Sequence, residues 1–157
     1  MTEPTPAPTS RPSSEDGPAA EDGPAAGDAP APDPEVLELA AKVFDLARQG
    51  DTAALAAYVD AGVPADLTND RGDTLLMLAA YHGNAETVLA LLQRGADADR
   101  ANDRGQTPLA GAVFKSEQQV IDALVEAGAD PAAGVPSAID TARMFGNDKL
   151  LARFGAS

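Results

Sequence analysis

The sequence predicts an all-α protein: a solenoid of about four helix-turn-helix repeats, with the first and last acting as caps, preceded by a disordered N-terminal tail. Three observations support this prediction. The N-terminal segment lacks large apolar residues, several glycines recur at a spacing of 33 residues, and apolar residues between them follow helical spacing. A unit this short cannot bury its apolar face alone, so neighbouring units must stack into one continuous core.

Residues 1–34 are predicted to form the disordered tail. Residues 2–34 contain no Val, Ile, Leu, Met, Phe, Tyr or Trp, and they hold nine of the 13 prolines, seven acids and one base, Arg11. The hexamer EDGPAA occurs twice in tandem, at 15–20 and 21–26. Such a segment cannot bury enough apolar surface to offset the entropy lost on ordering its backbone. The tail is either a solvating extension without a specific role or a segment that attracts a basic partner by its negative charge.

The folded part of the chain is predicted to span residues 35–157 and to open with a capped helix. Asp33 is suited to accept hydrogen bonds at the helix start, and Pro34 suits the first helical position. Apolar residues then recur at helical spacing, at Val36, Leu39, Val43 and Leu46.

A 33-residue period sets the repeat boundaries. Asn69-Asp70-Arg71-Gly72 recurs letter for letter as Asn102-Asp103-Arg104-Gly105, and Gly95-Ala96-Asp97 recurs as Gly128-Ala129-Asp130. The period predicts repeats at about 69–101 and 102–134, flanked by a degenerate first repeat at about 35–68 and a truncated last repeat at about 135–155, whose offset is 30.

Each repeat is predicted to hold two short helices. In the second repeat these cover about Thr74–His82 and Ala85–Arg94, and Gly95 ends the pair because glycine adopts the left-handed conformation without a Cβ penalty. In the third repeat, Ser116 and Gln119 predict a capping box at the start of the second helix.

With this period, these paired short helices and the glycine that ends each pair, the chain resembles the ankyrin repeat family. The segment GDTLLMLAAYHGNAETVLALLQRGADAD at 72–99 is similar to the pattern G-x-T-P-L-H-x-A-A-x-x-G-x-x-E-x-V-x-x-L-L-x-x-G-A-D. The segment 105–130 resembles it as strongly and keeps Thr107-Pro108-Leu109. The resemblance covers 35–157 and none of the tail.

The chain departs from the family pattern at the motif histidine, which is Met77 in the second repeat and Ala110 in the third. In ankyrin repeats that histidine takes part in hydrogen bonds between neighbouring repeats, so the resemblance implies that this network is missing. Phe154, and Tyr58 at the matching position of the first repeat, are expected to close the two ends of the core.

The resemblance implies a concave face that binds another protein. The positions on this face lie in the connectors and at the ends of the first helices: Asp70, Arg71, Asp73, Asp103, Arg104, Gln106, Tyr81, His82, Phe114 and Lys115. We expect Tyr81 and Phe114 to anchor the partner, with the two arginines as rim contacts. Alternatively, the two rings complete the stack between adjacent helices, the arginines form internal ion pairs, and His82 is a solvent-facing helix-end residue without a role as a pH switch.

Composition excludes several other functions. The chain has 11 basic and 25 acidic side chains, a net charge of −14, which disfavours nucleic acid and anionic lipid as partners. Without cysteine and with one histidine, no cofactor, metal or catalytic site is predicted, and Asp97, Asp99 and Asp103 do not match a calcium loop. No stretch has the apolar length of a membrane span or secretory signal.

Together these features predict a cytoplasmic, monomeric binding protein that is not an enzyme. The alternative is an inhibitory or regulatory subunit that acts on a basic partner through its acidic tail and negative charge.

Overall fold

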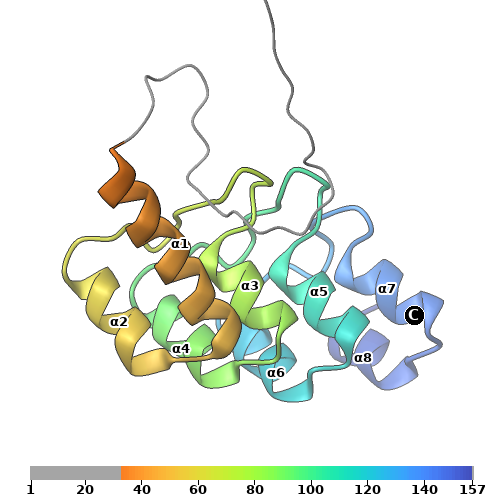
Figure 1. Cartoon of the computed structure of the whole chain (residues 1–157). Helices are drawn as coiled ribbons and strands as arrows, with labels where there is room; N and C mark the ends of the chain where they lie inside the picture. The colour runs from red at the N-terminus through yellow and green to blue at the C-terminus, as the bar shows by residue number, and fades with distance from the viewer. Residues whose placement is uncertain (1–32, 157) are drawn as a thin grey trace, which may run out of the picture.

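The structure, a computed structural model, describes residues 33–156, and within them the chain forms eight α-helices in two layers (Figure 1). One layer, here called the inner layer, holds α1 (Pro34–Gln49), α3 (Leu75–Tyr81), α5 (Pro108–Lys115) and α7 (Ala138–Met144). The other, outer layer holds α2 (Thr52–Asp60), α4 (Ala85–Gln93), α6 (Gln118–Glu126) and α8 (Asp148–Arg153). The predicted helical solenoid is confirmed, while the disorder predicted for residues 1–32 lies outside the described residues.

The inner helices begin where their capping residues stand. The side chain of Asp33 accepts a hydrogen bond from the Glu35 amide at 3.0 Å, and Pro34 is the first residue of α1. Thr74 and Thr107 cap α3 and α5 in the same way, through their hydroxyl oxygens. Because a cap is a local interaction, these starts follow from the sequence.

The capping box predicted for Ser116 and Gln119 is wrong. Ser116 ends α5 in the left-handed conformation with φ of 59°, and α6 starts after Glu117, which makes no side-chain cap hydrogen bond. Ser116 stands one period after Gly83, whose φ is 77°, so it takes over the helix-ending role of that glycine. A capping box does form between Ser137 and Asp140, at the start of α7.

The core runs between the two layers along the whole stack. Within the inner layer α3 packs against α1 and α5, and α5 packs against α7; in the outer layer α4 packs against α2 and α6. Ala79, Ala112 and Ala142 are fully buried at the inner-layer contacts, where small side chains let the helices approach closely. Larger side chains fill the space between the layers, among them Phe44, Leu76, Leu91, Leu109 and Leu124.

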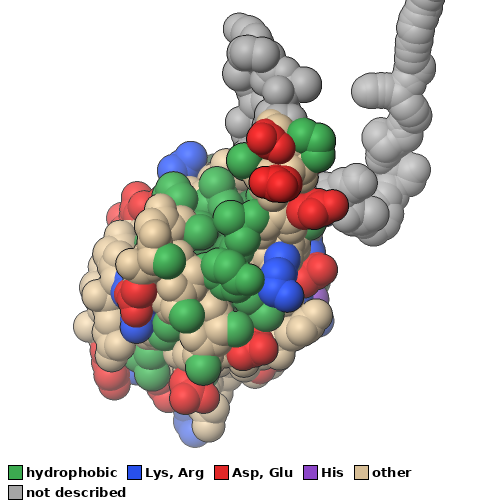
Figure 2. All heavy atoms as spheres, turned by 60° about the vertical axis from the view of Figure 1, so that its left-hand side comes forward, with side chains coloured by type: hydrophobic (Ala, Val, Ile, Leu, Met, Phe, Trp, Pro, Cys, Tyr) green, Lys and Arg blue, Asp and Glu red, His purple; other side chains and the backbone are tan. Residues whose placement is uncertain are grey.

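The two ends of the stack are less enclosed than expected. Phe154 and Tyr58 pack against the core but remain partly exposed. On α1 the apolar pattern holds, yet its first turns are largely exposed: Val36 is 50%, Leu37 39% and Leu39 38% exposed. Figure 2 shows hydrophobic side chains gathered at the end of the stack formed by α1 and α2.

Polar contacts join successive repeats without using the motif-histidine positions, where Met77 and Ala110 are buried. The Asn84 side-chain amide donates to the carbonyls of Ala47 and Arg48, both at 2.9 Å, and so satisfies the C-terminal end of α1. Further along the stack, the Asp130 amide donates to the carboxylate of Asp99 at 2.7 Å. Neighbouring repeats are thus tied by several dispersed hydrogen bonds.

Two ion pairs between outer-layer helices predict a loss of stability in acid. Hydrogen bonds from Arg94 to Asp60, at 2.9 and 3.2 Å, and from Arg153 to Asp122 lower the pKa of both carboxyl groups. Because the folded pKa lies below the unfolded value of about 3.9, the contribution is complete above that value. It is lost as the pH falls through the folded pKa.

We therefore expect the double variant Asp60→Asn and Asp122→Asn to lose less stability than the wild type between about pH 5 and pH 2. Urea denaturation at a series of pH values measures this difference. High salt should reduce it, because both carboxylates are exposed. Parallel pH profiles for the two proteins would contradict the prediction.

Candidate protein-binding groove

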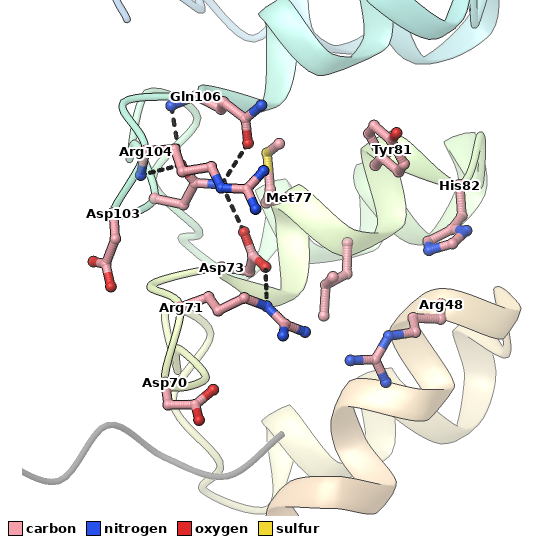
Figure 3. Close-up of a pocket in the computed structure, with 12 residues that line it drawn as sticks. Arg48, Asp70, Arg71, Asp73, Met77, Tyr81, His82, Asp103, Arg104 and Gln106 are labelled. Carbon is pink, nitrogen blue, oxygen red and sulfur yellow. Dashed lines mark hydrogen bonds and ion pairs between the residues drawn. The ribbon is translucent and has the colours of Figure 1, made fainter. Parts of the chain in front are cut away.

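A groove of about 520 Å³ lies between the connectors and the inner helices α1 and α3 (Figure 3). Eight of the ten residues expected on the binding face line it: Asp70, Arg71, Asp73, Tyr81, His82, Asp103, Arg104 and Gln106. The other two, Phe114 and Lys115, lie at the end of the next inner helix, α5, and contact the same region. The fold therefore brings all ten residues to one face, and whether they bind a partner stays a prediction.

The connector loops owe their shape to two asparagines. The side-chain oxygen of Asn69 accepts from the amides of Arg71 and Asp73, at 2.9 and 3.0 Å. Asn102 accepts from the amides of Arg104 and Gln106 at the same distances. Each loop folds around its own asparagine, a side-chain-to-backbone turn typical of this residue, so each arginine is held at a loop tip.

The two loops are also joined to each other. The Asn102 side-chain amide donates to Asp73 at 2.8 Å and to Gln106 at 2.9 Å, and Arg71 lies 3.8 Å from the same Asp73 carboxylate. Arg71 therefore forms an internal ion pair, which was the alternative to a partner contact for this residue. Figure 3 shows the guanidinium groups of Arg71 and Arg48 pointing toward one another across the groove, while the Asp103 side chain points away from it.

Aromatic side chains continue this face beyond the loops. Tyr81 is 37% exposed and Phe114 is 53% exposed, so neither ring is sealed inside the stack. The Lys115 ammonium lies 5.0 Å from the centre of the Tyr81 ring, a cation–π contact, and the Phe114 ring lies 5.8 Å from that of Phe145. The rings touch their neighbours along the stack and still present surface to solvent.

A smaller apolar hollow of about 180 Å³ lies between Tyr81 and Phe114, over Gly111. Gly111 stands one period after Leu78, and a Cβ at this position would lie 3.2 Å from the Met77 methyl group. The missing side chain leaves room for the hollow and lets Met77 and Tyr81 lie over α5. We did not expect Gly111 or Met77 at the site, although a leucine replaced by glycine within the repeat was a visible signal.

The end of the groove near His82 holds two basic side chains that act on this histidine. Burial lowers the pKa of His82 first, and the charges of Arg48 and Lys115 lower it further. The pKa of Arg48 is itself lowered by burial and then by Arg71. His82 is therefore neutral at pH 7, with two cations close to it.

Two of the aspartates considered as calcium ligands instead accept hydrogen bonds from backbone amides. The Asp97 carboxylate accepts from the amide of Asp99, and the Asp99 carboxylate accepts from the amide of Asp130. In the part of the chain that the structure describes, no three His, Cys, Asp or Glu side chains gather as a metal site would require. The same residues include no helix with the length and apolarity to cross a bilayer.

Three comparisons agree with this architecture. A stretch of 55 residues is 49% identical to a Pseudomonas aeruginosa protein named as an ankyrin repeat protein, and it covers 35% of this chain and 32% of that protein. The chain thus spans about a third of that curated relative. The crystal structure of the human ASB11 ankyrin repeat domain is similar, with a TM-score of 0.55 and 28% identity, over 57% of this chain and 40% of that one. A family model of three ankyrin repeats matches residues 38–134, and the chain belongs to the ankyrin repeat family.

Proposed function

We propose that the chain binds another protein through its concave face, with Tyr81 and Phe114 as anchors. Ankyrin repeats are in general protein–protein interaction modules without chemistry of their own. The observation that carries the proposal here is the pair of exposed rings on either side of the hollow over Gly111, next to the larger groove. Large rings bury much area at low entropic cost, as binding hot spots do.

The two parts of the face differ in chemistry, and this difference supports a protein partner. The hollow is lined largely by apolar side chains and suits an apolar side chain of the partner. The groove beside it presents Arg71, Arg104 and Gln106 for polar contacts around that anchor. Residues 33–156 carry 19 acidic and ten basic side chains, which favours a protein over nucleic acid. A monomer acting in the cytoplasm to regulate or scaffold its partner is part of the same proposal.

Affinity capture with the full chain tests the proposal. We expect Tyr81→Ala or Phe114→Ala to weaken binding of the captured partner by about tenfold each, a loss typical of interface residues that matter. Both rings are substantially exposed, so the melting temperature should change little.

The matched control is Leu89→Ala, which also removes a large side chain that is 45% exposed but lies on the outer helix α4. It should retain the partner at wild-type affinity. A partner held equally well by all three variants would contradict concave binding. A collapse of stability in the ring variants would show instead that the rings complete the stack.

A further inference from the structure

We propose that the acidic N-terminal segment, residues 1–32, occupies the cationic end of the groove in its own chain and competes there with the partner. We define the cationic end as Arg48, Arg71 and Lys115, the three basic side chains near His82. The competition rests on the proposed function, because it needs the concave face to be the partner site. The contact between segment and groove does not, and it can be tested without any partner.

The cationic end is built from three successive inner helices. Arg48 lies at the end of α1, His82 follows α3, and Lys115 is the last residue of α5. Arg48 and His82 line the same groove, and the Lys115 ammonium lies 5.0 Å from the ring of Tyr81, the residue next to His82. In residues 33–156, where acids outnumber bases by 19 to ten, this grouping of cations on the concave face is a distinct feature.

Carboxylates also lie near His82. The Glu117 carboxylate stands 2.6 Å from where a Cβ on the neighbouring Gly83 would be. Asp45 pairs with Arg48 at 2.8 Å, and Asp73 is held by Asn102 and faces Arg71. Asp70 and Asp103 sit on the connector tips, and Asp103 points away from the groove (Figure 3). Burial lowers the pKa of His82 most, and the charges of Arg48 and Lys115 lower it further.

The segment has the complementary chemistry. Residues 1–32 contain six acids and one base, and apart from Met1 they contain no large apolar side chain. The segment therefore fits the cationic end and has nothing to fill the apolar hollow over Gly111. That hollow would stay open for the apolar side chain of a partner.

The spacing of the acids matches the spacing of the helices. The tandem hexamers place the pair Glu15-Asp16 six residues before Glu21-Asp22, which is about 19 Å in an extended proline-rich chain. Arg48 and Lys115 are two inner helices apart, and packed helices lie about 8–10 Å from one another. The two acid pairs can therefore reach across the width of the three helices that carry Arg48, His82 and Lys115.

The chain is long enough for this contact. The segment enters α1 at Pro34, and Arg48 lies about 21 Å further along that helix at 1.5 Å per residue. Asp22 is 12 residues before Pro34, a contour of about 37 Å in an extended chain. Because the segment and groove are parts of one molecule, the effective concentration is about millimolar, so weak charge pairing suffices.

The single histidine gives a direct test by NMR titration of the full chain. In the variant Glu15→Gln, Asp16→Asn, Glu21→Gln and Asp22→Asn, we expect the pKa of His82 to fall by about 0.5 at low salt, because nearby carboxylates favour the charged imidazole. The difference should vanish at about 1 M salt. The control variant Glu86→Gln, Glu126→Gln and Asp148→Asn removes acids from the outer helices and should leave the pKa of His82 unchanged.

The absence of cysteine allows a second test by spin labelling. A nitroxide on Ala19→Cys should broaden the resonances of Tyr81 and His82 at low salt and leave those of Leu89, on the outer face, sharp. An unchanged pKa of His82 in the variant, or broadening elsewhere than at the groove, overturns the proposal. Neither result would contradict partner binding by the concave face, because that proposal is tested separately with the Tyr81→Ala and Phe114→Ala variants.

Competition is tested once the partner is captured. If the segment occupies the groove, the four-acid tail variant should bind the partner several-fold more tightly than the wild type. Weaker binding would mean that the segment itself contacts a basic partner, and equal binding would mean that it does not reach the partner site. Both results overturn the competition.

Discussion

Replacing Leu91 by alanine should lower the free energy of unfolding by about 2–5 kcal/mol, the cost of deleting a buried leucine and leaving a cavity. Leu91 is 1% exposed on α4, which packs against α3 and against both neighbouring outer helices. Because stability in a repeat array is a sum of repeat and interface terms, damage to a central repeat affects the contacts on both sides. Urea denaturation followed by circular dichroism measures the loss.

Leu89 provides the matched control, since it lies on the same helix but is 45% exposed. Leu89→Ala makes the same chemical change with the same helix propensity, so the pair isolates burial. We expect its effect to stay within about 0.5 kcal/mol. Equal losses for the two variants would mean that the stack does not bury its outer helices as described.

Gly72→Ala should cost about 2–4 kcal/mol, from a strained backbone together with overpacking. Gly72 has φ of 78°, and a Cβ there would lie 2.5 Å from the Asp103 carboxylate and 2.9 Å from the Asp103 amide nitrogen. The backbone cannot yield easily, because that amide donates to the Arg71 carbonyl at 3.0 Å. The substitution should also disturb the connectors that hold Arg71 and Arg104.

Gly105→Ala separates the two contributions. Gly105 has nearly the same φ, 81°, yet the nearest atom to its missing Cβ is the Val135 carbonyl oxygen at 3.4 Å, an ordinary contact. It should therefore cost only the backbone strain, about 1–2 kcal/mol. Equal losses at Gly72 and Gly105, measured by urea denaturation, would show that the contact with Asp103 carries no energy.

The repeats and the starts of the inner helices could be predicted because both depend on short-range chemistry. A 33-residue period with threonine caps at 74 and 107 defines each unit whatever surrounds it. The ten residues expected on the binding face came instead from the resemblance to ankyrin repeats, which implies that equivalent positions in stacked units share a face. The fold gathers them at the groove and the neighbouring helix end.

Other features escaped prediction because they depend on what the next repeat supplies. Ser116 looked like a helix start, yet its place one period after Gly83 makes it a helix end. Gly111 was not predicted at the site, and its role lies in the space it leaves beside Met77 and Tyr81. The exposure of the first turns of α1 likewise depends on a neighbour that no local pattern reveals.

The tetrapeptides at 69–72 and 102–105 show the difference between what can and what cannot be predicted from the sequence. By itself, the sequence determined that the two tetrapeptides occupy equivalent positions of one repeat. In the structure both form the same asparagine-centred turn, with the glycine at positive φ. Only the tertiary structure decided that Gly72 lies tightly against Asp103, whereas Gly105 has only an ordinary contact with Val135. It also decided that the Arg71 side chain extends toward Arg48. The physical reason is range: turns and caps are satisfied within a few residues, whereas packing and electrostatic potential come from atoms that stacking brings together.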